Sequence, residues 1–277
     1  MNERLADTLP RTDLSKASGE PYRGKGMILM RWVDTPDGGR KQMDFRLTPE
    51  LFLHQTHEDR ICYCTRHNDA VLEIAHLLRH HFRSAPDVTV FRDMLHLLGP
   101  GLPTPGPDVS VVRGLRKQET ERFELDLERD GVRPCLIVEV VSPGDRLIRQ
   151  ADLKDKVEVY ERAGVQEYVI VDWTLMNLRF RLVGYRLDSS GRYQPIQPDT
   201  EGRFLSETAG VWFQVSPVGQ RILLYEHPTG RRLLNLEEQE ERAKDAERKA
   251  LREGEARKAA EAEVERLRAE IERLRGE

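Results

Sequence analysis

The chain has 277 residues, of which 38% are hydrophobic and 33% are charged, and its formal net charge at pH 7 is −4. This length allows one large domain or two modest ones with a sizeable core. The charge balance excludes a strongly basic surface that would collect nucleic acid. Any affinity for DNA must therefore come from a local groove, and it should weaken as salt is added.

The cysteines and the hydropathy pattern indicate a cytoplasmic protein. The three cysteines, Cys62, Cys64 and Cys135, do not form the pattern of a disulfide framework, so a reducing compartment fits best. The N-terminus has no signal-peptide pattern, and no stretch is long enough to span a bilayer. We therefore expect a cytoplasmic location and no membrane partner.

The first part of the chain predicts a polar arm followed by a hairpin. Residues 1–25 are polar and contain Pro, Gly and Ser, which is typical of a loose terminal arm. Residues 27–33 and 42–47 have strand character and flank a Pro-Asp-Gly-Gly turn signal at 36–39. We expect this hairpin to open a domain that covers residues 26–235.

A helix is expected over residues 68–82, where apolar residues recur at helical spacing and Asn68 can cap the N-terminus. Glu73 on this helix could extend into an active site, although a surface position is the simpler interpretation. Just before the helix, a C-x-C pair and His67 suggest zinc. This is the weaker interpretation, because no second pair of ligands follows at zinc-site spacing.

Two strands joined by a Pro/Gly-rich turn come next. Residues 88–94 have strand character, and the turn at 99–106 leads into a second strand, 109–112, so that the two form a hairpin. Asp108 lies at the start of the second strand. A helical turn is expected near residues 119–127.

Residues 134–173 have the pattern strand, loop, helix, strand. Residues 135–141 are almost entirely apolar and β-branched, which is typical of a strand buried on both faces. Residues 152–162 carry apolar side chains at helical spacing until Gly164 ends the helix. Residues 167–172 form a second apolar run. These are the parts of a βαβ unit with two parallel strands.

Glu139 is the charge that interrupts the first of these strands. A buried carboxylate is costly unless a partner, a proton or a metal compensates it. Asp108, at the start of the preceding strand, and Glu139 can converge on a hard cation. Magnesium prefers one or two carboxylates together with waters and phosphate oxygens. The pair therefore predicts a magnesium or manganese site.

A lysine would complete a site for phosphodiester hydrolysis. Two-carboxylate nucleases commonly place it two positions after the glutamate, on the same strand face, but that position is Val141 here. Lys154 or Lys156 on the following helix could replace it. Lys156 shares a helical stripe with apolar residues, whereas Lys154 points elsewhere, so we assign the role to Lys156.

The rest of the domain predicts β-structure. Residues 178–187 and 193–196 alternate between apolar and polar side chains and should form a hairpin. Further short strands are expected near 204–205, 211–213 and 222–225.

Residues 236–277 predict one long charged helix, because the segment 237–277 holds 14 acidic and 11 basic residues. Its last part carries apolar residues at the spacing of a coiled-coil seam. The seam is short, so a weak coiled coil and a solvated charged helix are equal alternatives, and we expect a homodimer. The seam residues are Val264, Leu267, Ile271 and Leu274.

Taken together, these motifs resemble the Uma2 family of restriction-endonuclease-like proteins, which are common in cyanobacteria and other bacteria and belong to the PD-(D/E)xK superfamily. The resemblance covers about residues 65–235 and, in general character, the terminal helix. The segments that carry it are HNDA at 67–70, Pro107–Asp108, PCLIVEVVSP at 134–143, DLKDKVEVY at 152–160, GVQEYVIVD at 164–172 and GYR at 184–186.

The resemblance implies an α/β (α+β) fold: a restriction-endonuclease-like core with a mixed central sheet flanked by helices, added β-hairpins and a long C-terminal helix. It also implies a metal-dependent endonuclease that hydrolyses phosphodiester bonds of DNA. Asp108, Glu139 and the Val140 carbonyl would hold Mg²⁺ or Mn²⁺, and Lys156 would orient water or stabilise the anion. The residues expected to support them are Tyr160, Ser142 and Glu73.

Two other classes of function stay open. The chain could be a catalytically inactive module of the nuclease fold that binds DNA or a protein and oligomerises through its C-terminal helix. It could also be an interaction protein whose tail is the functional part. For Glu139, the corresponding alternative is a structural ion pair with Lys156.

Overall fold

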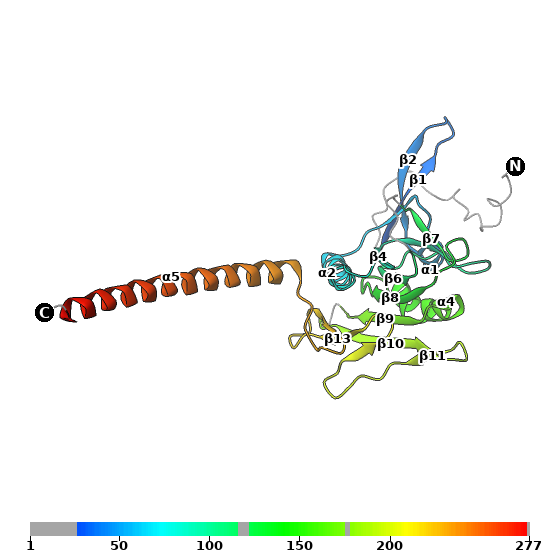
Figure 1. The fold of residues 1–277 in the computed structure, drawn as a ribbon. Helices are drawn as coiled ribbons and strands as arrows, with labels where there is room; N and C mark the ends of the chain where they lie inside the picture. Colours follow the sequence, from blue (N-terminus) through cyan, green and yellow to red (C-terminus); the bar gives the residue numbers. More distant parts are fainter. Residues whose placement is uncertain (1–26, 116–121, 175–177, 276–277) are drawn as a thin grey trace. The chain divides into compact units, whose positions relative to one another are not determined.

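The computed structural model describes residues 27–115, 122–174 and 178–275. The chain divides into two compact units between Arg232 and Leu233 (Figure 1). The fold is mixed α/β with a central mixed sheet and a long C-terminal helix, so the predicted fold class is confirmed. The predicted N-terminal arm lies outside the described residues.

A six-stranded sheet in the order β11-β10-β9-β8-β6-β4 forms the centre of the first unit. Strands β8 and β9 pair in parallel, and the other neighbours pair antiparallel. The parallel pair confirms the predicted βαβ unit. The strands are β4 (Val88–Arg92), β6 (Val109–Arg113), β8 (Pro134–Val140), β9 (Glu167–Asp172), β10 (Arg181–Leu187) and β11 (Tyr193–Pro195).

Every residue of β8 and of β9 is buried, as expected for strands covered on both faces. Helix α2 (Thr65–His81) packs against β4, β6 and β8. Helix α4 (Lys156–Ala163) packs on the face to which Ile137 and Ile170 point. Because side chains alternate along a strand, Glu139 points to the same face as Ile137. The sheet therefore directs this carboxylate toward α4.

The connection from β8 to β9 is a helix interrupted by a π-helical turn. It consists of α3 (Arg146–Gln150), the π-helical turn Ala151–Asp155 and α4. The helical region thus begins earlier than the predicted residue 152, because Asp145 caps α3 by accepting from the Leu147 N–H at 2.9 Å. It ends at Gly164, as predicted, with the left-handed φ of 74° that glycine tolerates.

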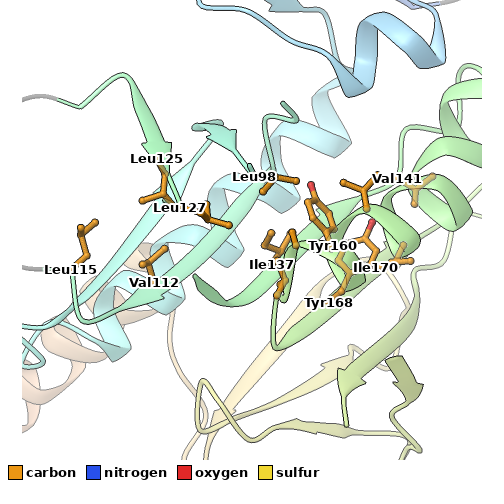
Figure 2. Close-up of a cluster of buried hydrophobic side chains, with 13 residues drawn as sticks. Leu98, Val112, Leu115, Leu125, Leu127, Ile137, Val141, Tyr160, Tyr168 and Ile170 are labelled. Atoms are coloured by element: carbon orange, nitrogen blue, oxygen red, sulfur yellow. The ribbon is translucent and has the colours of Figure 1, made fainter. Parts of the chain in front are cut away.

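Apolar residues of α4 and the sheet form a core cluster. Figure 2 shows Tyr160 of α4 and Tyr168 of β9 within it, and their ring centroids are 4.9 Å apart in an edge-to-face arrangement. Leu98, Leu125 and Leu127 complete the cluster beside Ile137. The two tyrosine rings therefore lie in an apolar environment close to the strand that carries Glu139.

Helix α2 begins at Thr65 with Cys64 at the N-cap position, so the predicted N-cap at Asn68 is wrong. The Asn68 N–H donates to the Cys64 carbonyl at 3.1 Å and already belongs to the first turn. This earlier start places His67 inside the helix. The side chains of Cys62 and Cys64 are exposed.

A second sheet, in the order β2-β1-β3, lies in the N-terminal part of the first unit, and its β1–β2 hairpin confirms the prediction. Phe52 and Leu29 from this part pack with Ile148 and Ala151 of the β8–β9 connection. The N-terminal sheet is thereby held against the helical connection. Its elements are β1 (Ile28–Asp34), β2 (Arg40–Arg46), α1 (Pro49–Leu53) and β3 (Asp59–Ile61).

Two smaller sheets complete the first unit: β5 pairs in parallel with β7, and β12, β13 and β14 form an antiparallel sheet. The helical turn predicted near 119–127 is wrong at Glu124–Asp126, which is β7, because Leu125 is fully buried between two partly exposed neighbours. The remaining strands are β5 (Leu95–Leu97), β12 (Phe204–Ser206), β13 (Val211–Val215) and β14 (Ile222–Glu226).

The second unit contains the helix α5 (Leu236–Arg275), which has 40 residues. Residues 240–271 are all exposed. Within the described residues, no helix is both long and apolar enough to cross a membrane.

Candidate active site

Strands β6 and β8 bring Asp108 and Glu139 together. The register pairs Val109 with Val138. Asp108, the residue before β6, therefore lies beside Glu139, the residue after Val138. The Val140 N–H donates to Asp108 Oδ2 at 2.7 Å, and the Asp108 N–H lies 3.4 Å from Glu139 Oε2. Both side chains are almost completely buried, with exposed fractions of 3% and 2%. The backbone of each strand therefore fixes the carboxylate of the other.

Lys156 enters this pair from the first turn of α4. Its Nζ lies 2.9 Å from Glu139 Oε1 and 3.0 Å from Asp152 Oδ1, and its side chain is fully buried. The π-helical turn that carries Asp152 precedes α4 directly. π-Helical turns are often found at functional sites. Lys154, on the same turn, is exposed, so the predicted difference between the two lysines is present in the structure.

Two tyrosines hold the ends of this network. The Tyr160 hydroxyl donates to Glu139 Oε1 at 2.7 Å, and the Tyr168 hydroxyl donates to the Asp152 carbonyl at 3.0 Å. Both rings are fully buried. Tyr160 thus holds the Glu139 carboxylate, while Tyr168 holds the backbone of the turn that carries Asp152.

The other predicted supporting residues are placed differently. Ser142 is buried just beyond the end of β8. Glu73 is held by Arg221, whose Nε donates to Glu73 Oε1 at 3.1 Å, next to β14 rather than β8. The Val140 N–H donates to Asp108. The role of the Val140 carbonyl as a metal ligand stays a prediction.

Sequence reasoning missed two members of the network, His67 and Asp152. His67 Nε2 lies 3.3 Å from Asp108 Oδ1, and the imidazole stacks on Tyr63 with ring centroids 3.9 Å apart. The sequence signal for Asp152 was its position one turn before Lys156, the spacing at which side chains meet on a helix. His67 had no comparable signal, because its partner Asp108 lies far along the sequence, directly before β6.

Burial and mutual repulsion shift the acidities at this site. Burial raises the pKa of Glu139 to about 8, and it raises the pKa of Asp152 to about 6. Burial acts in the same direction on Asp108, but His67 and Lys156 outweigh it and lower the pKa of that carboxyl. The pKa of Lys156 is raised, because the three carboxylates outweigh its burial. The ammonium is therefore charged, whereas the raised pKa keeps the Glu139 carboxyl largely protonated near neutral pH.

The donor set fits a hard divalent cation. Asp108 and Glu139 offer carboxyl oxygens from adjacent strands, and an added positive charge would offset the burial and the repulsion by Asp108 that raise the pKa of Glu139. Within the described ranges, no group of three or more His, Cys, Asp and Glu side chains is arranged to hold a metal. One or two carboxylates are the usual protein share of a magnesium site, and Asp108 and Glu139 would supply them.

A cleft of about 600 Å³ lies beside the network. His67 lines this cleft and also contacts Asp108. Arg60, from the N-terminal sheet, and Arg92, at the end of β4, line it as well. Asp93, another lining residue, has a left-handed φ of 50°, which is uncommon outside glycine, and its N–H donates to the Asp108 carbonyl at 3.2 Å.

The model of the Uma2 family, described as "Putative restriction endonuclease", matches residues 65–219, which is more than half of the chain. The chain belongs to this family. The match contains Asp108, Glu139 and Lys156 and begins where α2 begins, so the N-terminal sheet and Phe52 lie outside the Uma2 match.

Comparison with solved structures finds a crystal structure of "a putative nuclease belonging to DUF820" from Anabaena variabilis ATCC 29413. It is 14% identical to this chain, and the alignment covers 51% of this chain and 75% of that chain with a TM-score of 0.37. A search of curated proteins found no match.

Proposed function

We propose that this Uma2 protein is a metal-dependent endonuclease that hydrolyses phosphodiester bonds of DNA. One observation carries the proposal: two buried carboxylates on adjacent strands, Asp108 and Glu139, with the ammonium of Lys156 at 2.9 Å from the second. Membership of a family described as restriction endonucleases supports the same chemistry. The arrangement matches what metal-assisted phosphodiester hydrolysis needs from a protein.

Each residue has a defined task in this proposal. Asp108 and Glu139 would hold Mg²⁺ or Mn²⁺, which when bound would supply electrostatic stabilisation of the transition state and an acidified water. Lys156 stays charged and donates hydrogen bonds to water or to a phosphate oxygen. Tyr160 and Asp152 keep the ammonium and the Glu139 carboxylate in place.

The cleft beside His67 is the proposed route of the substrate. Arg60 and Arg92 on its walls can contact phosphates, although Asp59, Asp69 and Asp93 line the same cleft. With a net charge of −4, the chain as a whole does not attract DNA, so any attraction must come from this local groove. We expect DNA binding to be modest and to weaken with added salt.

A second function rests on the same network. Glu139 Oε1 accepts from both Lys156 and Tyr160, and both oxygens of Asp108 face protein donors at Val140 and His67. A Glu139 carboxylate with this many protein partners could instead form a structural ion pair with Lys156. The chain would then be an inactive nuclease-fold module that binds DNA or a protein.

Plasmid nicking together with metal-binding calorimetry separates these two functions. Wild-type protein should convert supercoiled plasmid to nicked or linear DNA with Mg²⁺ or Mn²⁺ and stop with chelator. Asp108→Asn and Glu139→Gln keep the side-chain shapes but should lower nicking by about 10²-fold or more. Both should weaken Mn²⁺ binding in calorimetry. Equal Mn²⁺ binding and equal cleavage by wild type and both variants would support the structural alternative.

A further inference from the structure

Helix α5 presents a long exposed surface, because every residue from 240 to 271 is exposed. Its 40 residues correspond to a rod about 60 Å long. Val264, Leu267 and Ile271 are about half exposed, at 47%, 45% and 50%. Helices in proteins gain most of their stability from packing an apolar face, so a seam of this kind favours a partner helix.

The heptad register set by Val264 at position a and Leu267 at position d extends toward the N-terminus of α5. It passes through small side chains, and it meets two opposite charges in the middle of the helix. Going backward from Val264, the a and d positions are Ala260, Arg257, Glu253, Ala250, Ala246 and Ala243. The seam is therefore longer than its large apolar residues suggest, with a charged centre.

The charged centre distinguishes between the two possible orientations of a helix pair. In a parallel, in-register dimer each core residue faces its own copy, so Glu253 would face Glu253 and Arg257 would face Arg257. Two layers of like charge would then lie next to each other. In an antiparallel dimer, a positions face d positions, and Glu253 faces the partner's Arg257 in two symmetric layers. Opposite charges in contact favour this orientation.

The size of the remaining seam residues favours the same orientation. In the antiparallel register that pairs Glu253 with the partner's Arg257, Ala246 faces the partner's Val264 and Ala243 faces the partner's Leu267. Val264 and Leu267 then each pack against an alanine, whereas Ile271 faces the partner's Gln239. A parallel pair would instead place Ala246 against its own copy and leave a thinly packed half.

The charges at the centre are available for such a pairing. Within one chain, Glu253 lies 3.8 Å from Lys249 and Arg257 lies 3.2 Å from Glu261. The side chains of Glu253 and Arg257 are 69% and 80% exposed, so these surface pairs contribute little and can exchange partners.

We propose that α5 forms an antiparallel two-stranded coiled coil with a second copy of this chain, centred on the Glu253–Arg257 layers. The first unit of each copy is joined to its α5 at the N-terminal end of the helix. The two joints then lie at opposite ends of a rod about 60 Å long. This proposal is independent of the nuclease proposal, because it uses no residue of the candidate active site.

Charge exchange at the centre tests the pairing. The dissociation constant of the full-length dimer is measured by analytical ultracentrifugation for wild type, Arg257→Glu, Glu253→Arg and the double exchange. Each single change should raise the constant at least about tenfold, because it creates like-charge layers, and the double exchange should restore it. In a parallel dimer every variant keeps like-charge layers, so equal constants would overturn the proposal. A monomeric wild type would also overturn it.

Disulfide trapping tests the orientation directly, in a chain where the exposed Cys62 and Cys64 are replaced by Ser and the buried Cys135 is kept. Ala250→Cys and Ala260→Cys proteins are oxidised separately and after refolding together. The mixture should give the linked dimer, whereas each protein alone should not, because copies of residue 250 lie about 15 Å apart along an antiparallel axis. Linkage of each variant to itself would establish the parallel dimer instead. Circular dichroism checks that both variants keep the helix.

Discussion

Lys156 is the residue on which the buried charges of the site depend. It lies between Glu139 and Asp152, and its Nζ is 3.9 Å from the centroid of the Phe52 ring. A buried carboxylate that loses its counter-charge is strongly destabilising, even where the complete pair contributes little to stability. The same ammonium is the candidate donor to the reacting phosphate. Stability and activity should therefore both respond to this one side chain.

Replacement of Lys156 by Met keeps the aliphatic volume and removes the charge. We expect the free energy of unfolding, measured by urea denaturation, to fall by about 3–5 kcal/mol, because Glu139 and Asp152 lose their counter-charge. Nicking of plasmid should fall by about 10²-fold. Mn²⁺ binding measured by calorimetry on the folded variant should be largely retained, because the lysine is not a metal ligand.

Lys154→Ala is the matched control, because Lys154 lies two residues away and is exposed. Its effect on unfolding should stay within about 0.5 kcal/mol, and nicking should be unchanged. A loss of activity from Lys154→Ala alone would assign the catalytic role to Lys154.

At the scale of elements, the sequence predicted what depends on local pattern. The buried runs of β8 and β9 and the terminating Gly164 predicted the βαβ unit, and the apolar stripe of the following helix predicted that Lys156 faces inward. The π-helical turn was not predictable, because regular helical spacing contains no sign of one extra residue in a turn. The contact of His67 with Asp108 could not be predicted because it depends on the packing of α2 beside β6, whereas Asp152 lies at the i,i+4 spacing from Lys156, which is a local signal.

The N-terminal sheet covers the site without belonging to the Uma2 match. Phe52 of α1 is 2% exposed and packs with Ile148 and Ala151, while its ring lies over Lys156. The ring covers the ammonium and holds the sheet to the helical connection. Sequence alone did not predict this link, because it joins two segments with no common pattern.

Substitution of Phe52 tests whether this cover supports the site. Phe52→Ala should lower the free energy of unfolding by about 3–5 kcal/mol, the usual cost of removing a buried aromatic ring. Phe52→Leu keeps an apolar side chain and loses the contact of the cation with the ring, so its cost should be about 1–2 kcal/mol. Urea denaturation measures both changes. Similar small losses in the two variants would mean that the ring is not an anchor for the sheet.

On the scale of the whole molecule, the buried core and the proposed self-association belong to different units. The core clusters and the candidate site lie before Arg232, whereas the exposed seam lies in α5. The segment 237–277 holds 14 of the 48 acidic residues and 11 of the 44 basic ones, so the rest of the chain is close to neutral. Loss of the helix should therefore change association more than folding.

Deletion of residues 240–277 tests this division. Every residue from 240 to 271 is exposed, so the deletion removes no buried side chain in that range. The melting temperature of the first unit should change by less than about 2 °C, which corresponds to less than about 1 kcal/mol for a domain of this size. Ultracentrifugation should show a monomer, and circular dichroism should show the loss of helix.

The shorter deletion of residues 264–277 provides the control, because it removes the large apolar side chains and leaves the charged and alanine-rich half of α5 in place. It should abolish the dimer as fully as the longer deletion, since Val264 and Leu267 are the partners of the alanines in the antiparallel pair. The melting temperature should again stay constant. A fall of more than about 4 °C in either protein would show that α5 packs on the first unit, and its exposed seam would then be a surface for that domain rather than for a second copy.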